Sequence, residues 1–309
     1  MGKPKPAPRY KQNGNTHMTN TPNILFLGAG YTAKCMIRQL RHIDQFAGSR
    51  IHGTTRTGQN FQNIKDAGAT PVLFEGTGPS ETLRRLIKAA DFILSSISPK
   101  QEGDAVLAHH AADIVANNTL KWLGYLSTVG VYGDHQGAWV NEESQAKPSS
   151  ERSKWRKQAE DNWLKLHQDH STPVHIFRLP GIYGPGRGPL NKLKQGRARR
   201  IEKKGQVFNR AHVEDIAQTL IQSLRNPNPG SIYNIADDEP APPQDVLAYG
   251  AQLLGIEPPP LIPFNEAEMT TMARSFYTDN KKVSNKRIKE ELAIKLKYPT
   301  YREGLKACV

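Results

Sequence analysis

The sequence has only two cysteines, Cys35 and Cys308, far apart along its 309 residues. Two distant cysteines indicate neither a disulfide framework nor a thiolate metal site. Long apolar runs are also missing. The longest, Ile24–Leu27, ends at a glycine and is far shorter than the roughly 20 residues that span a membrane. No secretory signal pattern is visible. These absences predict a cytoplasmic protein with no membrane anchor and no metal site.

Acidic residues are too few to balance the basic ones, and the chain carries a formal net charge of +13. The segment 1–22 is basic, holds proline and asparagine and has almost no apolar side chains, so we expect it to be disordered. The densest remaining patch is LNKLKQGRARRIEKKG (190–205). Two interpretations of it stay open, a solvated surface and a site for a phosphorylated or carboxylated ligand. Nucleic-acid binding is disfavoured, since no recognisable reading module accompanies the charge.

Short apolar runs alternate with helical stretches from residue 23 onward. Continuous apolar strands separated by helices are typical of a parallel sheet that is covered on both faces. We therefore predict an α/β fold with a doubly wound parallel sheet of the Rossmann type and a smaller C-terminal substrate-binding region. The expected strands are 23–28, 49–56, 70–76, 90–98, 121–133 and 173–184. The nucleotide-binding domain is assigned to 23–183 and 206–237, and the substrate-binding region to 184–205 and 238–309.

The segment GAGYTA (28–33) follows the first expected strand and opens a helix. In a dinucleotide-binding turn the first glycine permits the tight turn and the second lets the backbone approach a pyrophosphate. The final small residue allows close helix–strand packing, and the phosphates lie on the helix N-terminus. An ordinary strand–helix turn is the alternative. We assign to the cofactor Gly28, Gly30, Tyr31, Thr32 and Ala33.

No acidic residue stands at the end of the second expected strand, where an enzyme selecting NAD usually places a carboxylate for the ribose 2′-hydroxyl. The segment GTTRT (53–57) offers Thr55 and Arg56 instead. A guanidinium can bind a 2′-phosphate and stack on adenine. The sequence therefore favours NADP, with NAD as the alternative cofactor. The alternative to a cofactor role for Arg56 is an exposed arginine at the start of a helix.

Five further segments follow one another in a recognisable order: STVGVYG (127–133), WVNEES (139–144) with Pro148, RLPGIYGPGR (178–187), NRAHVEDIAQ (209–218) and SIYNIADDEP (231–240). In this combination the chain resembles the extended short-chain dehydrogenase/reductases, in their epimerase/dehydratase-like branch, from residue 23 to the C-terminus. ARSFYTDNKKVSN and LKYPTYREGL near the end are similar to an atypical subgroup.

The resemblance implies roles for individual residues. Thr128 occupies the position of the family's catalytic serine or threonine, which donates a hydrogen bond to a substrate oxygen; an ordinary strand-end threonine is the alternative. The resemblance also places several residues against the cofactor: Ser96, Ile97, Ser98, Ser127, Pro180, Gly181 and Ile182.

The family's catalytic tyrosine and lysine are absent from SERSKWRKQAE (150–160). Counting from Glu160, the resemblance puts Arg156 in the lysine position, as a catalytic and cofactor-binding residue, and Arg152 in the tyrosine position. Arginine does not deprotonate in proteins, so Arg152 cannot act as a general base. Arg156 could still hold ribose hydroxyls and polarise a carbonyl.

Two other interpretations of this helix stay open. The two arginines could be solvated on an exposed face, or a shift of register could turn Lys154 or Trp155 toward the site. The acidic residues Glu142, Glu143, Glu214 and Asp215 have counterparts in the family that stabilise loops and cap a helix, so we expect structural roles for them.

Two functions remain open. The first is an NADP-dependent oxidoreductase or epimerase-like enzyme with a rebuilt active site, acting on an anionic small molecule. Its proton would come from water, from the substrate or from a side chain such as Tyr183. The second is a dinucleotide-binding redox sensor or regulatory protein without turnover. We expect a monomer or homodimer with no nucleic-acid partner.

Overall fold

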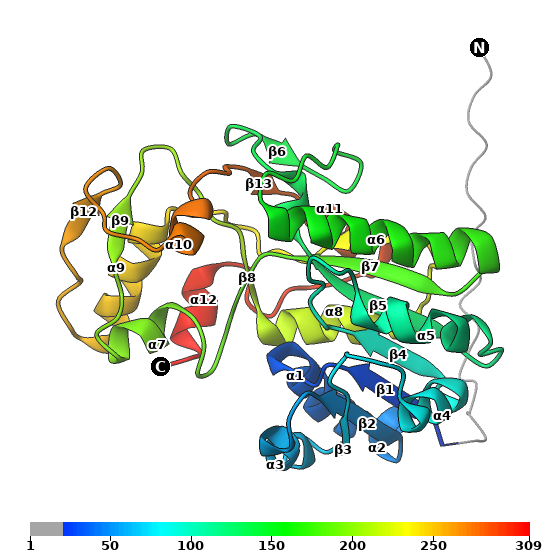
Figure 1. Ribbon diagram of the computed structural model, residues 1–309. Helices are drawn as coiled ribbons and strands as arrows, with labels where there is room; N and C mark the ends of the chain where they lie inside the picture. Colours follow the sequence, from blue (N-terminus) through cyan, green and yellow to red (C-terminus); the bar gives the residue numbers. More distant parts are fainter. Residues whose placement is uncertain (1–20) are drawn as a thin grey trace.

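The computed structural model describes residues 21–309, which build a seven-stranded parallel sheet with the order β11-β7-β5-β4-β1-β2-β3 (Figure 1). We predicted disorder for residues 1–22. Residues 1–20 of this segment lie outside the described part of the chain. The strands are β1 Asn23–Leu27, β2 Arg50–Thr55, β3 Thr70–Leu73, β4 Phe92–Ser95, β5 Trp122–Thr128, β7 Val174–Leu179 and β11 Ile232–Asn234. The predicted α/β fold with a doubly wound parallel sheet is confirmed.

Helices cover both faces of this sheet, because successive side chains of a strand point to opposite faces. In β1, Ile24 and Phe26 join one buried cluster while Leu25 and Leu27 join the other. The first face is covered by α1 Tyr31–Arg41, α2 Asp44–Ala47, α3 Phe61–Lys65, α8 Val213–Arg225 and α11 Lys286–Glu291. The second is covered by α4 Glu81–Ala89, α5 Ala105–Val115 and α6 Glu151–His170. Within residues 21–309, no helix is both long and apolar enough to cross a membrane.

The observed strands are shorter than the expected ones, and the difference is largest for 121–133 and 173–184. After β5 the chain turns through a 3-10 helix, η2 Val129–Tyr132, in which Thr128 Oγ1 accepts a hydrogen bond from Gly130 N at 3.1 Å. The run 173–184 is divided at Pro180, which has no N–H to donate, into β7 and the short β8 Gly181–Tyr183. Both interruptions fall at the carboxyl edge of the sheet.

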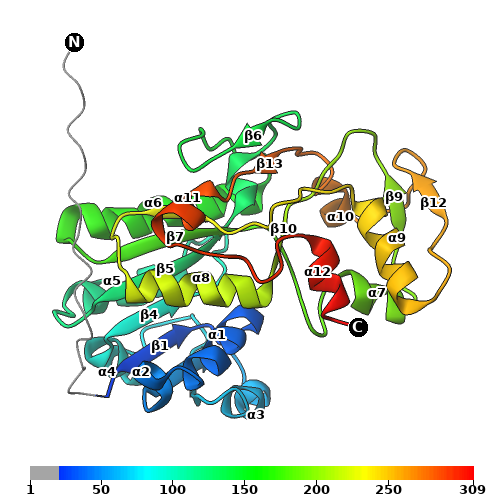
Figure 2. The same ribbon diagram turned by 180° about the vertical axis from the view of Figure 1, so that it is seen from behind.

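A smaller region lies to one side of the sheet (Figure 2). It contains α7 Pro189–Lys194, α9 Pro243–Leu254 and α12 Tyr301–Lys306, which share an apolar cluster with Tyr183. The remaining elements are η1 Gly58–Asn60, α10 Thr271–Ser275 and three strand pairs: β10 Arg210–His212 with β8, β12 Leu261–Pro263 with β9 Arg200–Glu202, and β13 Lys282–Val283 with β6 Trp139–Val140.

The segment 286–298, assigned above to the substrate-binding region, packs in the structure against the main sheet. Ile288, Leu292 and Ile294 are buried in the cluster beneath α1 and α8. Asp215 of α8 accepts hydrogen bonds from the backbone N–H groups of Lys297 at 2.7 Å and Tyr298 at 3.0 Å. The chain therefore leaves the sheet, builds most of the smaller region and returns before it ends in α12.

Candidate functional site

A cavity of about 1890 Å³ opens between the carboxyl edge of the sheet and the smaller region. Its first part, the cofactor half, is lined by the β1–α1 turn, the ends of β2, β4 and β5, and the first turns of α6. Its second part, the substrate half, is lined by segments 187–210 and 243–281. Ligands of open α/β sheets bind outside the carboxyl ends of the strands.

The glycine turn of the cofactor half is tight at Gly28 and open to the cavity at Gly30. Gly28 has φ +91°, and a Cβ there would lie 2.9 Å from Ser96 Oγ, so a larger residue is excluded. Gly30 lines the cavity, and a Cβ there would meet no atom within 4 Å. Helix α1 starts without a side-chain cap and without an acid in its first turn. Its first N–H groups are therefore available to an anion.

Four residues that the sequence assigns to the cofactor do not line the cavity of the described chain: Tyr31, Thr32, Ala33 and Ser127. Thr32, Ala33 and Ser127 are buried. The Tyr31 hydroxyl donates to Pro185 O at 3.0 Å, and burial raises the pKa of Tyr31 to about 12. At positions 31–33 only the backbone can contribute to an anion site at the start of α1.

The end of β2 carries the residues proposed for cofactor selection. Thr55 and Arg56 both line the cavity, and the Arg56 side chain is exposed. Thr55 Oγ1 donates to Thr57 O at 3.3 Å and accepts from Asn60 Nδ2 at 3.4 Å. The guanidinium of Arg56 has no hydrogen-bond partner among residues 21–309, so its donors are free for a ligand.

Thr128 and Arg156 lie on the same wall of the cofactor half. Arg156 Nη1 donates to Leu126 O at 2.7 Å and to the Tyr125 hydroxyl at 3.3 Å, and Nη2 donates to Ser98 Oγ at 2.9 Å. These bonds connect α6 to β5 and to the segment after β4. Among residues 21–309, Thr128 Oγ1 accepts a hydrogen bond from Gly130 N alone, which leaves its O–H free to donate. Five other predicted residues line the same half: Ser96, Ile97, Pro180, Gly181 and Ile182.

The first turns of α6 also present Arg152 to the cavity. Arg152 Nη1 lies 3.3 Å from Met272 Sδ of α10 and so connects the two halves. Of the two residues considered for a shifted register, Trp155 lines the cavity, whereas Lys154 pairs with Glu151 at 2.7 Å and does not.

The tyrosine named as a proton source, Tyr183, lines the cavity, but its hydroxyl is bonded to the backbone of the smaller region. The Tyr183 hydroxyl donates to Thr300 O at 3.4 Å, at the start of α12, and the side chain is 2% exposed. Burial raises the pKa of the Tyr183 hydroxyl, which disfavours loss of its proton. The geometry gives no support to a proton-transfer role for Tyr183.

The positive charge of the substrate half comes only in part from the predicted basic patch. From the basic patch 190–205, Lys192, Arg197 and Arg199 line the cavity. Arg210 and Lys281 also line it, and neither was among the predicted site residues. Both lie inside segments that were used to identify the family, but only the tertiary structure brings them to one wall.

The acidic residues have structural partners. Glu142 Oε1 accepts from Asn234 N at 2.8 Å, and Glu214 Oε2 accepts from Lys297 Nζ at 2.7 Å. Glu143 lies 3.3 Å from Arg287 on the surface. Within residues 21–309, no group of three or more His, Cys, Asp and Glu side chains is placed to hold a metal ion.

Comparison with known proteins identifies the family. The model of the NAD dependent epimerase/dehydratase family matches residues 28–236. The chain therefore belongs to this family, whose members are nicotinamide-dinucleotide enzymes.

Among curated relatives, Protein YeeZ of Escherichia coli (strain K12) is 35% identical over 158 residues, 50% of this chain and 51% of YeeZ. The chain thus matches about half the length of this relative. A solved structure of a conserved protein of unknown function from Silicibacter pomeroyi DSS is 48% identical, covers 93% of this chain and 98% of its own, and has a TM-score of 0.86. The dTDP-glucose 4,6-dehydratase of Bacillus anthracis str. Ames, solved with NAD, shares the fold at 19% identity, with coverage of 93% and 95% and a TM-score of 0.75.

Proposed function

We propose that the protein is an NADP-dependent oxidoreductase or epimerase-like enzyme that acts on a small anionic molecule with an atypical active site. The observation that carries this proposal is the single cavity in which an open glycine turn, Thr128 and Arg156 face a basic second half. The solved dehydratase that shares the fold contains NAD, which supports a dinucleotide in the first half.

Several residues that line the cofactor half would hold a dinucleotide. The turn at Gly28 and Gly30 and the first N–H groups of α1 would hold the pyrophosphate. Arg56 would bind a 2′-phosphate, and Arg156 would donate to ribose hydroxyls. When bound, the nicotinamide supplies the carbon that accepts or donates hydride.

Thr128 and Arg156 then orient a substrate oxygen. The Thr128 hydroxyl, with one lone pair bonded to Gly130 N, donates its proton into a hydrogen bond with that oxygen. Arg156 polarises it as a fixed cation. Neither Arg152 nor Arg156 transfers a proton, because a guanidinium stays protonated. The proton comes from water or from the substrate. A sensor without turnover is the second candidate, and it rests on the replacement of the Tyr/Lys pair.

Turnover that depends on the Thr128 hydroxyl distinguishes the enzyme from the sensor. We expect NADPH fluorescence to fall with at least one member of a panel of carboxylate- and phosphate-bearing carbonyl compounds. Thr128→Ala should lower that rate about 100-fold, since one lost donor to a developing oxyanion typically costs 10²–10³-fold. NADPH affinity should not change. Thr119→Ala, which removes a hydroxyl outside the cavity wall, is the control. Tight NADPH binding with no oxidation by any compound would support the sensor.

Arg56 should make the protein prefer NADPH over NADH. A charge-assisted hydrogen bond to the 2′-phosphate contributes on the order of 1.5–3 kcal/mol, so Arg56→Ala should weaken NADPH binding by roughly 10- to 100-fold and leave NADH unaffected. Calorimetric titration measures both. Arg50→Ala, at the opposite end of β2, should change neither affinity. Equal wild-type affinity for the two cofactors would refute the selection of NADP by Arg56.

A further inference from the structure

Two cations on the wall of the substrate half are almost fully buried. Arg210 is 8% exposed and Lys281 is 7% exposed, and both line the cavity. Taking a charge out of water is costly unless it is paired or binds a ligand. The other basic residues of this half, Arg187, Lys192, Arg197 and Arg199, are exposed and carry no such cost. The buried pair therefore needs its own explanation.

The two cations belong to segments that are fastened side by side. Asn209 Nδ2 donates to Lys281 O at 2.9 Å, and Val283 N donates to Asn209 Oδ1 at 2.8 Å. Both bonds use the residue directly before Arg210 and connect positions more than 70 residues apart. The Asn209 side chain thus holds the backbone next to Arg210 beside the backbone at Lys281.

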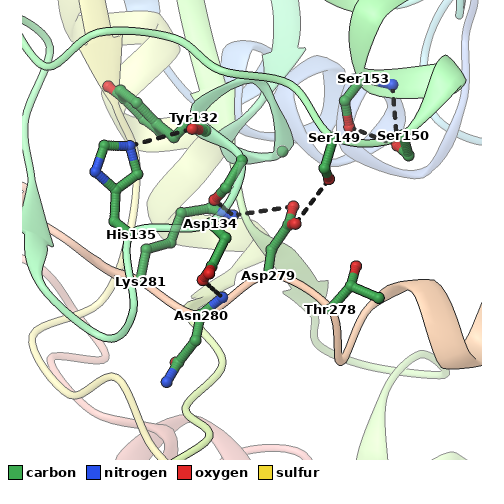
Figure 3. A network of polar contacts seen from close by, with 12 residues as sticks. Tyr132, Asp134, His135, Ser149, Ser150, Ser153, Thr278, Asp279, Asn280 and Lys281 are labelled. Carbon is green, nitrogen blue, oxygen red and sulfur yellow. Dashed lines mark hydrogen bonds and ion pairs between the residues drawn. The ribbon is translucent and has the colours of Figure 1, made fainter.

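Lys281 retains a donor for a ligand. Its ammonium donates to Gly133 O at 2.8 Å and lies 3.6 Å from Asp279 Oδ2. Asp279 in turn accepts a hydrogen bond from Ser149 Oγ at 2.7 Å (Figure 3). An ammonium has three N–H groups, and these are its two partners within residues 21–309. Burial lowers the pKa of the Lys281 ammonium, while Asp279 opposes that shift.

Arg210 is even less satisfied. Nη1 donates to Phe208 O at 2.9 Å and to Ala241 O at 3.1 Å, whereas Nε and Nη2 have no partner among the described residues. Asp237 is the acidic group with the largest effect on Arg210, and burial raises the pKa of its carboxyl to about 8. No ion pair of Arg210 with an acidic side chain forms among the described residues, and burial disfavours the charged form of Asp237.

Two aromatic side chains line the same half of the cavity. Phe208 and Tyr277 line the cavity, and their ring centroids lie 5.1 Å apart in an edge-to-face arrangement. Phe208 directly precedes the Asn209–Arg210 pair, and Tyr277 is four residues before Lys281. A ligand held by both cations would have an apolar surface beside it.

We propose that Arg210 and Lys281 form a carboxylate subsite, and that its ligand is a carboxylic acid whose flat apolar body packs against Phe208 and Tyr277. The proposal rests on the proposed function, in that it places this ligand in the substrate half of an enzyme's cavity. A planar guanidinium and one ammonium N–H match the two oxygens of a carboxylate. Asp279 beside Lys281 disfavours the second charge of a phosphate ester.

Calorimetric titration of the NADPH-saturated protein tests the subsite with three probes: phenylpyruvate, phenyl phosphate and the neutral ketone phenylacetone. We expect phenylpyruvate to bind at least about 10-fold more tightly than either of the others, as charge-assisted hydrogen bonds are worth that much. Arg210→Gln and Lys281→Met should each weaken phenylpyruvate about 10-fold or more and leave NADPH binding intact. Lys192→Gln, an exposed cation on the same wall, should have little effect.

Three results would overturn the subsite: no binding of phenylpyruvate, equal affinity for phenylacetone, or tighter binding of phenyl phosphate. An equal loss of phenylpyruvate affinity in Lys192→Gln and in the two buried variants would also overturn the subsite. It would mean that the ligand responds only to the overall positive charge of the cavity. Should Arg210→Gln not fold, Lys281→Met decides. The same titration without NADPH separates the two proposals. If the protein has no affinity for NADPH but binds phenylpyruvate in a way that depends on Lys281, the subsite is supported and the proposed function is refuted.

Discussion

Gly30→Val should abolish dinucleotide binding in a protein that still folds. The Cβ position at Gly30 meets no atom within 4 Å and the residue lines the cavity, so a valine side chain would occupy ligand space. The φ of −79° is compatible with any residue, so no backbone strain arises. Losing two or more hydrogen bonds to a pyrophosphate, each worth about 1.5–3 kcal/mol, should raise the Kd for NADPH by roughly 10²–10⁴-fold.

Gly48→Val is the matched control for this experiment. Gly48 has φ −82° and also has no atom within 4 Å of its Cβ position, but it lies at the end of α2 outside the cavity wall. Calorimetry should find wild-type NADPH affinity in this variant, and thermal unfolding should find both variants folded. Unchanged NADPH affinity in folded Gly30→Val would mean that the glycine turn is only a structural element.

Glu160→Ala should cause a large loss of stability, because it breaks a buried ion pair between α6 and β7. Glu160 and Arg178 are 1% and 3% exposed, and they are joined by two hydrogen bonds of 2.8 and 3.1 Å. Arg178 also lies over the Tyr132 ring at 4.8 Å. Without Glu160 the guanidinium is buried with no counter-charge, and breaking such a pair typically costs about 3–5 kcal/mol. Urea unfolding measures this free energy.

A neighbouring ion pair on the same helix provides the comparison. Lys157 and Asp161 pair on the surface, so Asp161→Ala should cost less than about 0.5 kcal/mol. Arg178→Met in the Glu160→Ala background should recover part of the lost stability, because the uncompensated charge is removed. A Glu160→Ala effect no larger than that of Asp161→Ala would contradict a stabilising role for the buried pair. Its position between α6 and β7 indicates that it fixes the helix from which Arg152 and Arg156 reach the cavity.

The elements that sequence predicted well are those defined by local pattern. Continuous apolar runs identified the central strands, and the glycine turn after β1 identified the start of α1. The strand ends were less predictable, because Pro180 and the turn after Thr128 end hydrogen bonding where hydrophobicity continues. The close helix–strand packing expected of Ala33 agrees with its burial in the core beneath α1, whereas the burial of Thr32 could not be derived from the glycine pattern.

The substrate half could not be derived from local pattern. Arg210 and Lys281 meet through bonds made by Asn209, and Arg152 reaches Met272 across 120 positions. No periodicity encodes such distances. The sequence did show the abundance of positive charge, but it pointed to the exposed patch 190–205 rather than to the buried cations.

The return of segment 286–298 to the main sheet affects how this protein could be recombined with its relatives. Ile288, Leu292 and Ile294 complete the core of the dinucleotide-binding part after the chain has already built α9, β12 and α10. The two parts are therefore interleaved and not modules in series. A chimera that imports a foreign substrate region would have to keep these 13 positions from the recipient, or its first part would be left with an open core.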